Sequence, residues 1–114
     1  MRNQPSQSVR ESAESAAGVL FVDLDETITR DQAINGLSAE EIAQLELNEA
    51  VVAKIEQAVA SGVPVVMVTR NNAEWIERFF EARHELRPLF TDTLPCPTGN
   101  KSDAINAWLS AHDL

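Results

Sequence analysis

Residues 18–30 read GVLFVDLDETITR, and this stretch decides what the sequence predicts for the fold. Four apolar residues, 19–22, run without interruption into Asp23, and a second carboxylate, Asp25, follows two positions later. A continuous apolar run indicates a strand buried on both faces, as in a parallel sheet. Ligands of open parallel sheets bind at the carboxyl ends of the strands, where Asp23 would lie. Two carboxylates there are costly unless a cation or a reaction needs them, so the pattern favours an enzyme.

The remainder of the chain predicts further helices and strands. Ser38 and Glu41 form a capping box, and Asn48 and Asn71 are expected to cap two more helices. The elements expected after the first strand (19–23) are, in order, helices over 38–47 and 48–62, a strand over 65–69, a helix from 71 that stops at Pro88, a strand over 89–92 and, after a loop over 94–100, a helix from 101. This β-α-α-β-α-β-α order predicts a parallel sheet.

Three features, in chain order, resemble motifs of the haloacid dehalogenase (HAD) superfamily. The run DLDET over 23–27, directly after an apolar strand, is similar to the first motif of that family, D-x-D-x-T. The apolar strand that ends in Thr69 resembles the second motif, and Lys101 near a helix start resembles the third. The resemblance covers residues 18–114 and implies an α/β, Rossmann-like HAD fold. Its parallel sheet would be flanked by helices, with a minimal cap over about 20 residues, 28–47.

The family's fourth motif, an acidic pair or triad after a further strand, has no counterpart here. The resemblance therefore implies that residues 18–114 are an incomplete domain whose C-terminal strands are missing. Without those strands, the strand 19–23 would form a sheet edge with unpaired backbone groups, which invites aggregation. We accordingly expect the 114 residues to behave as an unstable, weakly active or inactive fragment.

The resemblance also implies a Mg²⁺-dependent phosphatase. Asp23 would be the nucleophile that forms an aspartyl-phosphate, and Asp25 the general acid and then the general base. Thr69 would hydrogen-bond a phosphoryl oxygen, and Lys101 would neutralise developing negative charge. The Mg²⁺ ion would be bound at Asp23 and Asp25, in the second case through the backbone carbonyl. Thr27 would brace the turn after the strand.

Two other functions stay open. A HAD-like domain that binds without turnover is one, because the missing fourth motif would leave Mg²⁺ with few side-chain ligands. A phospho-accepting receiver domain is the other, since receivers also place acids, a Thr and a Lys around Mg²⁺. In receivers the paired acids adjoin and an acceptor Asp follows a middle strand, whereas here the second strand ends in Thr69. Arg30 and Arg70 stay open between substrate binding and a solvated role.

Composition limits the partners of the chain. With a net charge of −9 over 114 residues, the sequence argues against nonspecific binding to nucleic acid or to an anionic membrane. A phosphorylated substrate would be repelled at long range, so a cation and local bases are needed. In the family that the sequence resembles, small caps go with open sites, with large or protein-borne phosphates, or with capping by a partner subunit, so a homo-oligomer stays open.

Other features bear on location and order. No apolar segment typical of a secretory signal follows Arg2, and no transmembrane run is present, so a cytoplasmic location is expected. The single cysteine, Cys96, allows no internal disulfide and is expected to be a small loop residue. Residues 1–17 are polar and are expected to form a disordered leader.

Overall fold

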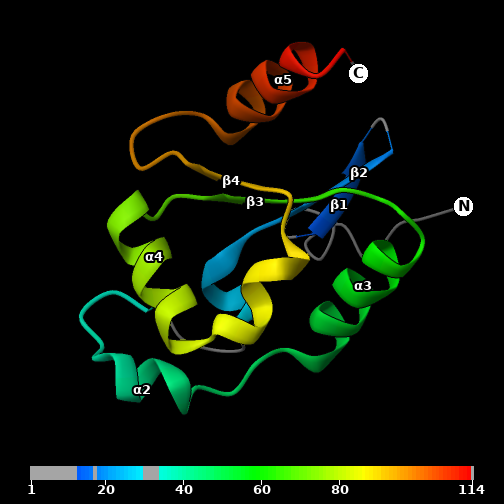
Figure 1. Cartoon of the computed structure of the whole chain (residues 1–114). Coiled ribbons are helices and arrows are strands. Elements are labelled where there is room, and N and C mark those ends of the chain that lie inside the picture. The colour runs from blue at the N-terminus through cyan, green and yellow to red at the C-terminus, as the bar shows by residue number, and fades with distance from the viewer. Residues whose placement is uncertain (1–12, 17, 30–33, 114) are drawn as a thin grey trace, which may run out of the picture.

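A four-stranded sheet in the order β1-β2-β3-β4 forms the centre of the structure (Figure 1). Strands β2 (Val19–Val22), β3 (Val65–Thr69) and β4 (Asp92–Pro95) run parallel, as predicted, and β1 (Ala13–Ala16) pairs antiparallel with β2. The computed structural model describes residues 13–16, 18–29 and 34–113. Within these ranges, none of the helices has the length and apolar character needed to span a membrane.

Strand β1 corrects the expectation that strand 19–23 is a sheet edge. Ala13 lies opposite Val22 and Ala16 opposite Val19, so β2 has a neighbour on each side. Gly18, at a φ of 80°, supplies the left-handed backbone of the turn between the two strands. β1 belongs to the segment 1–17 that was predicted to be disordered, and for these four residues that prediction is wrong. The remainder of that segment lies outside the described residues.

Helices cover both faces of the sheet, which explains the apolar strands. Helices α3 (Glu49–Ala60) and α4 (Ala73–Ala82), with α2 (Ala39–Ala43) beside α4, lie on one face, and α5 (Lys101–Ala111) lies on the other (Figure 1). Alternate strand residues therefore enter two separate cores. The core under α3 and α4 includes Leu20, Val22, Val65 and Met67, and the core under α5 includes Val19, Phe21, Val66, Val68 and Trp108.

Helix starts follow the predicted caps at two of three positions. The capping box at α2 is confirmed, because the Ser38 hydroxyl accepts from the Glu41 N–H at 3.1 Å and the Glu41 carboxylate accepts from the Ser38 N–H at 2.9 Å. Asn48 caps α3 as predicted. The cap of α4 is Asn72, whose side chain accepts from the Trp75 N–H at 3.1 Å, so the prediction of Asn71 is wrong.

Element ends differ from the prediction where packing overrides local pattern. Helix α2 stops at Ala43, short of the predicted 47. Helix α4 ends at Ala82, and a 3₁₀ helix, His84–Leu89, continues the chain. Leu86, Leu89 and Phe90 pack into the core under α3 and α4, which keeps this segment out of the sheet. Strand β4 consequently occupies 92–95 instead of 89–92.

Candidate functional site at the carboxyl ends of the strands

Asp23 and Lys101 form an ion pair at the carboxyl end of β2. Asp23 follows that strand directly, and its Oδ1 accepts from the Leu24 N–H at 2.7 Å. Its Oδ2 lies 2.6 Å from Nζ of Lys101, the first residue of α5. The two side chains keep 22% and 29% of their surface exposed. The contact brings the residues of the first and third predicted motifs to one position.

The position of Lys101 is electrostatically unusual for its helix. A cation at a helix N-terminus opposes the helix dipole, which favours anions there. The N-terminus of α5 is already capped by Asn100, whose side chain accepts a hydrogen bond from the Ser102 N–H at 2.7 Å. The Asp23 carboxylate offsets the cost of placing a lysine at this helix end.

Asp25 lies in a single π-helical turn, Leu24–Ile28, that directly follows Asp23. Leu24 and Ile28 are fully buried and anchor this turn in the core under α3 and α4. Both oxygens of the Asp25 carboxylate accept hydrogen bonds. Oδ1 accepts from the Ile34 N–H at 3.1 Å, and Oδ2 accepts from the side-chain amide of Asn71. Asp25 is therefore held between the segment before α2 and the loop after β3.

Thr69 ends β3 and is fully buried. Its hydroxyl oxygen accepts from the Asn71 N–H at 3.2 Å, and its carbonyl oxygen accepts from the Cys96 N–H at 2.8 Å and from the Cys96 thiol. The Thr69 hydroxyl thus shapes the loop that carries Asn71. A substrate would reach this hydroxyl only after a local shift of the loop, because the residue has no exposed surface in this conformation.

The sequence prediction missed Asn71 as a site residue. It assigned Asn71 to helix capping, a role that Asn72 fills. The available signal was position: Asn71 stands two residues beyond the end of β3, at the same edge of the sheet as Asp23 and Asp25. A buried asparagine at that edge needs hydrogen-bond partners, and two of the nearby groups are a carboxylate and a threonine hydroxyl.

Other residues from the sequence prediction surround this edge. Thr27 is buried, as a bracing role would require. Arg70 is exposed, and its guanidinium donates to the Gly99 carbonyl at 3.4 Å. Cys96 is a loop residue, as predicted; it directly follows β4 and is buried against β3. Arg30 lies outside the described residues.

The carboxylates at this edge suit a hard cation with few protein ligands. Mg²⁺ is commonly bound by one or two carboxylates, with water and phosphate oxygens as the other ligands. Among the described ranges, no group of three or more His, Cys, Asp or Glu side chains is arranged to hold a metal ion. The Asp23 carboxylate is therefore the type of ligand that a Mg²⁺ ion shared with a phosphorylated ligand would use.

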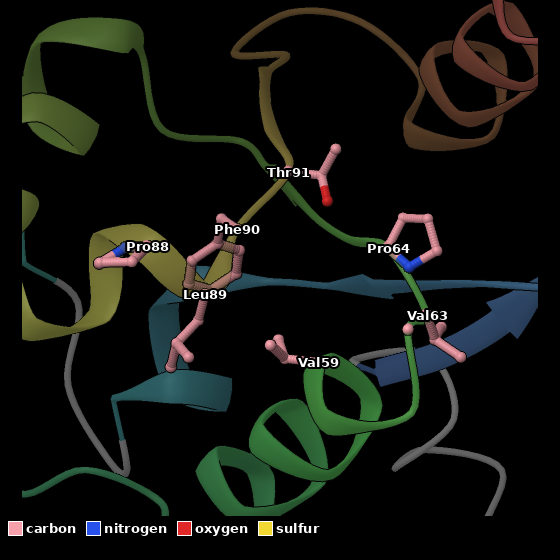
Figure 2. A pocket seen from close by; sticks show the side chains of 8 residues that line it. Val59, Val63, Pro64, Pro88, Leu89, Phe90 and Thr91 are labelled. Carbon is pink, nitrogen blue, oxygen red and sulfur yellow. The ribbon is translucent and has the colours of Figure 1, made fainter.

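A pocket of about 330 Å³ lies at the opposite end of the sheet (Figure 2). It is bounded where β3 and β4 begin, by Pro64 and Thr91, and by the end of α3 at Val59. Most of the residues that line it are apolar, Leu89 and Phe90 among them. None of the predicted site residues lines it, so this pocket is separate from the carboxylate edge.

Comparison with known proteins adds no family to these observations. No protein-family model matches the sequence, and searches of curated proteins and of solved structures find no match either. The structure itself defines a small α/β protein with three parallel strands flanked by helices.

Proposed function

We propose that this protein is a Mg²⁺-dependent phosphomonoester hydrolase of the HAD type, acting through an aspartyl-phosphate. The observation that carries the proposal is the contact of 2.6 Å between Asp23 and Lys101 at the carboxyl end of β2. The order of the three motifs in the sequence supports the same reading. A phosphoryl-transfer site needs a nucleophile and a nearby cation at one position, and these two residues supply both.

In the first chemical step, an Asp23 oxygen attacks the phosphorus of the substrate. A P–O bond to Asp23 forms, and the P–O bond to the leaving alcohol breaks. Lys101 neutralises the negative charge of the Asp23 carboxylate before attack and of the phosphoryl oxygens during it. The second Asp23 oxygen stays oriented by the Leu24 N–H, which keeps the attacking carboxylate fixed at the end of the strand.

Asp25 handles the protons in both steps. It gives a proton to the oxygen of the leaving alcohol and then takes a proton from the water that attacks the phosphoenzyme. That attack releases inorganic phosphate and restores the Asp23 carboxylate. The Asp25 carboxylate is oriented for both transfers by its hydrogen bonds from the Ile34 N–H and from the Asn71 side-chain amide.

Mg²⁺ would be held by Asp23 and the Asp25 backbone carbonyl, and when bound it screens the repulsion between the nucleophile and the phosphate dianion. Such screening matters in a chain with a net charge of −9. Lys101 supplies a second, fixed positive charge at the same place.

The test is hydrolysis of p-nitrophenyl phosphate by the full chain with Mg²⁺ and with EDTA. Because β1 pairs with β2, the exposed sheet edge that led to the expectation of an unstable chain is not present, and we expect weak activity with Mg²⁺. We expect none in EDTA and none in Asp23→Asn, because an amide cannot attack phosphorus. Glu56→Gln, which changes an exposed acid on α3, is the matched control and should keep wild-type activity. Activity that survives in Asp23→Asn or in EDTA would overturn the mechanism. Phosphate retained on Asp23 without release would instead favour a domain that accepts phosphate without turnover.

A further inference from the structure

We infer that Asn71 is the positioning residue for Asp25, an inference that rests on the proposed function. Asn71 is only 5% exposed, and a buried amide has to be hydrogen-bonded to avoid a desolvation cost. Its side-chain nitrogen donates to Oδ2 of Asp25, 46 positions earlier in the chain. A carboxylate only accepts hydrogen bonds when ionised, so the donor end of the amide must face it.

Both oxygens of the Asp25 carboxylate accept hydrogen bonds, and Asn71 donates to Oδ2. The Ile34 N–H donates to Oδ1, at 3.1 Å. With both oxygens engaged, the carboxylate cannot rotate about its last side-chain bond without losing a hydrogen bond. A general acid–base must stay within hydrogen-bond reach of the reacting oxygen, and small misplacements reduce the rate steeply. Removal of Asn71 should therefore reduce catalysis without removing any reacting group.

The Asn71 side chain neither caps helix α4 nor fixes the backbone of the loop in which it lies. Helix α4 is capped by Asn72. The backbone of the loop is fixed by the bond from the Asn71 N–H to the Thr69 hydroxyl, which involves no atom of the Asn71 side chain. Shortening Asn71 to alanine should thus leave the loop in place and free only the Asp25 carboxylate. Asn72→Ala provides the matched control, because it removes a neighbouring amide that serves the helix alone.

The first measurement compares kcat/KM for phenyl phosphate and p-nitrophenyl phosphate with Mg²⁺. Phenol is the poorer leaving group and depends more on protonation by Asp25. We expect Asn71→Ala to lower kcat/KM by about 10–100-fold for phenyl phosphate, which is less than the roughly 10²–10⁴-fold cost of losing acid–base catalysis because Asp25 itself remains, and by several-fold less for p-nitrophenyl phosphate. Asn72→Ala should lower thermal stability and change both substrates alike. Equal losses on the two substrates in Asn71→Ala would overturn the inference, since a merely structural role predicts that result.

The second measurement is a double-mutant cycle with Asp25→Ala. If Asn71 acts through Asp25, Asn71→Ala should change kcat by less than about twofold once Asp25 is gone, because coupled residues are not additive. The wild type, the two single variants and the double variant are also unfolded in urea, a measurement that does not depend on catalytic activity. Their midpoint shifts should be non-additive, and shifts that simply add would show that the contact is not formed and would overturn the inference.

These outcomes separate the inference from the proposed function. A wild-type chain without Mg²⁺-dependent hydrolysis overturns the proposed function, and with it the catalytic role of Asn71, even if the unfolding cycle is coupled. An active wild type in which Asn71→Ala and Asp25→Ala act independently overturns the positioning role alone.

Discussion

The Nζ atom of Lys101 lies 2.6 Å from Oδ2 of Asp23, although 78 positions separate the two residues in the chain. Both side chains are partly exposed, and ion pairs of this kind contribute only about 0–1 kcal/mol to stability. A cation at the N-terminus of α5 is, in addition, unfavourable for the helix. Stability alone therefore gives little reason for this pair, and we attribute it to the chemistry of the site.

Replacing Lys101 by methionine should separate the contribution of this ion pair to stability from its contribution to catalysis. We expect Lys101→Met to lower kcat/KM for an aryl phosphate by about 10²–10³-fold, the usual cost of removing one group that stabilises transition-state charge. Its free energy of unfolding in urea should change by less than about 1 kcal/mol. Lys54→Met, at an exposed position on α3, is the control for charge alone. Full activity in Lys101→Met combined with a large loss of stability would contradict the catalytic assignment.

The hydroxyl of Thr69 should matter for stability, because it accepts the hydrogen bond that fixes the loop carrying Asn71. Thr69→Val keeps the shape of the side chain but leaves the Asn71 N–H without its acceptor, which should destabilise the fold by about 1–3 kcal/mol. Thr69→Ser keeps the hydroxyl and should lose less. Urea unfolding of the two variants provides the comparison, and equal losses would mean that this hydrogen bond contributes little.

Arg83 should be one of the more important arginines for the structure. Its side chain is 16% exposed and donates to the carbonyl oxygens of Ile42 and Leu45, at the end of α2. Arg83→Met keeps the apolar stem and removes these donors, so we expect a loss of about 1–3 kcal/mol in the free energy of unfolding. The control is Glu77→Gln, which breaks the exposed pair with Arg87 and should cost about 0–1 kcal/mol. A larger loss in Glu77→Gln than in Arg83→Met would reverse this ranking.

Trp108 should couple the stability of α5 to the activity of the site. Its ring packs edge-on against Phe21 at 5.9 Å, and its Nε1 donates to Asp92 in β4 at 2.9 Å. Trp108→Ala should cost about 3–5 kcal/mol and also lower activity, because α5 carries Lys101. Trp108→Phe keeps an aromatic ring and should retain most of the activity. Thermal unfolding followed by circular dichroism, with kinetics on the same samples, measures both effects. Unchanged activity in a destabilised Trp108→Ala would show that α5 does not position Lys101.

The contact between Asp23 and Lys101 was predictable because both residues lie close to the carboxyl ends of parallel strands. An apolar run identifies a buried strand, and residues that follow parallel strands gather at one edge of the sheet. The contact of Asp25 with Asn71 was not predictable in the same way. Asn71 and Asn72 are adjacent and chemically identical, so capping preference cannot separate them. Only the path of the backbone after Thr69 decides which amide faces the helix and which faces the carboxylate.

Two parts of the fold were missed for related reasons. Strand β1 is four residues long and obtains its hydrogen bonds from β2, so its existence depends on tertiary pairing rather than on local pattern. Strand β4 lies at 92–95 instead of 89–92 because Leu89 and Phe90 pack against the helices. A short apolar run in the sequence looks the same whether it forms a strand or packs against helices, so the sequence could not separate the two.

The long separation between Asp23 and Lys101 also sets the order in which the site is assembled during translation. At about 5–20 residues per second, the ribosome adds Lys101 roughly 4–16 seconds after Asp23. Residues of all four strands are added to the chain before Lys101, so the lysine is the last of these groups to be made. Over the same interval Phe21 and Val66 have no helix above them, because α5 is made last among the described elements. Protection of this apolar face and completion of the ion pair are therefore a single event, the docking of α5.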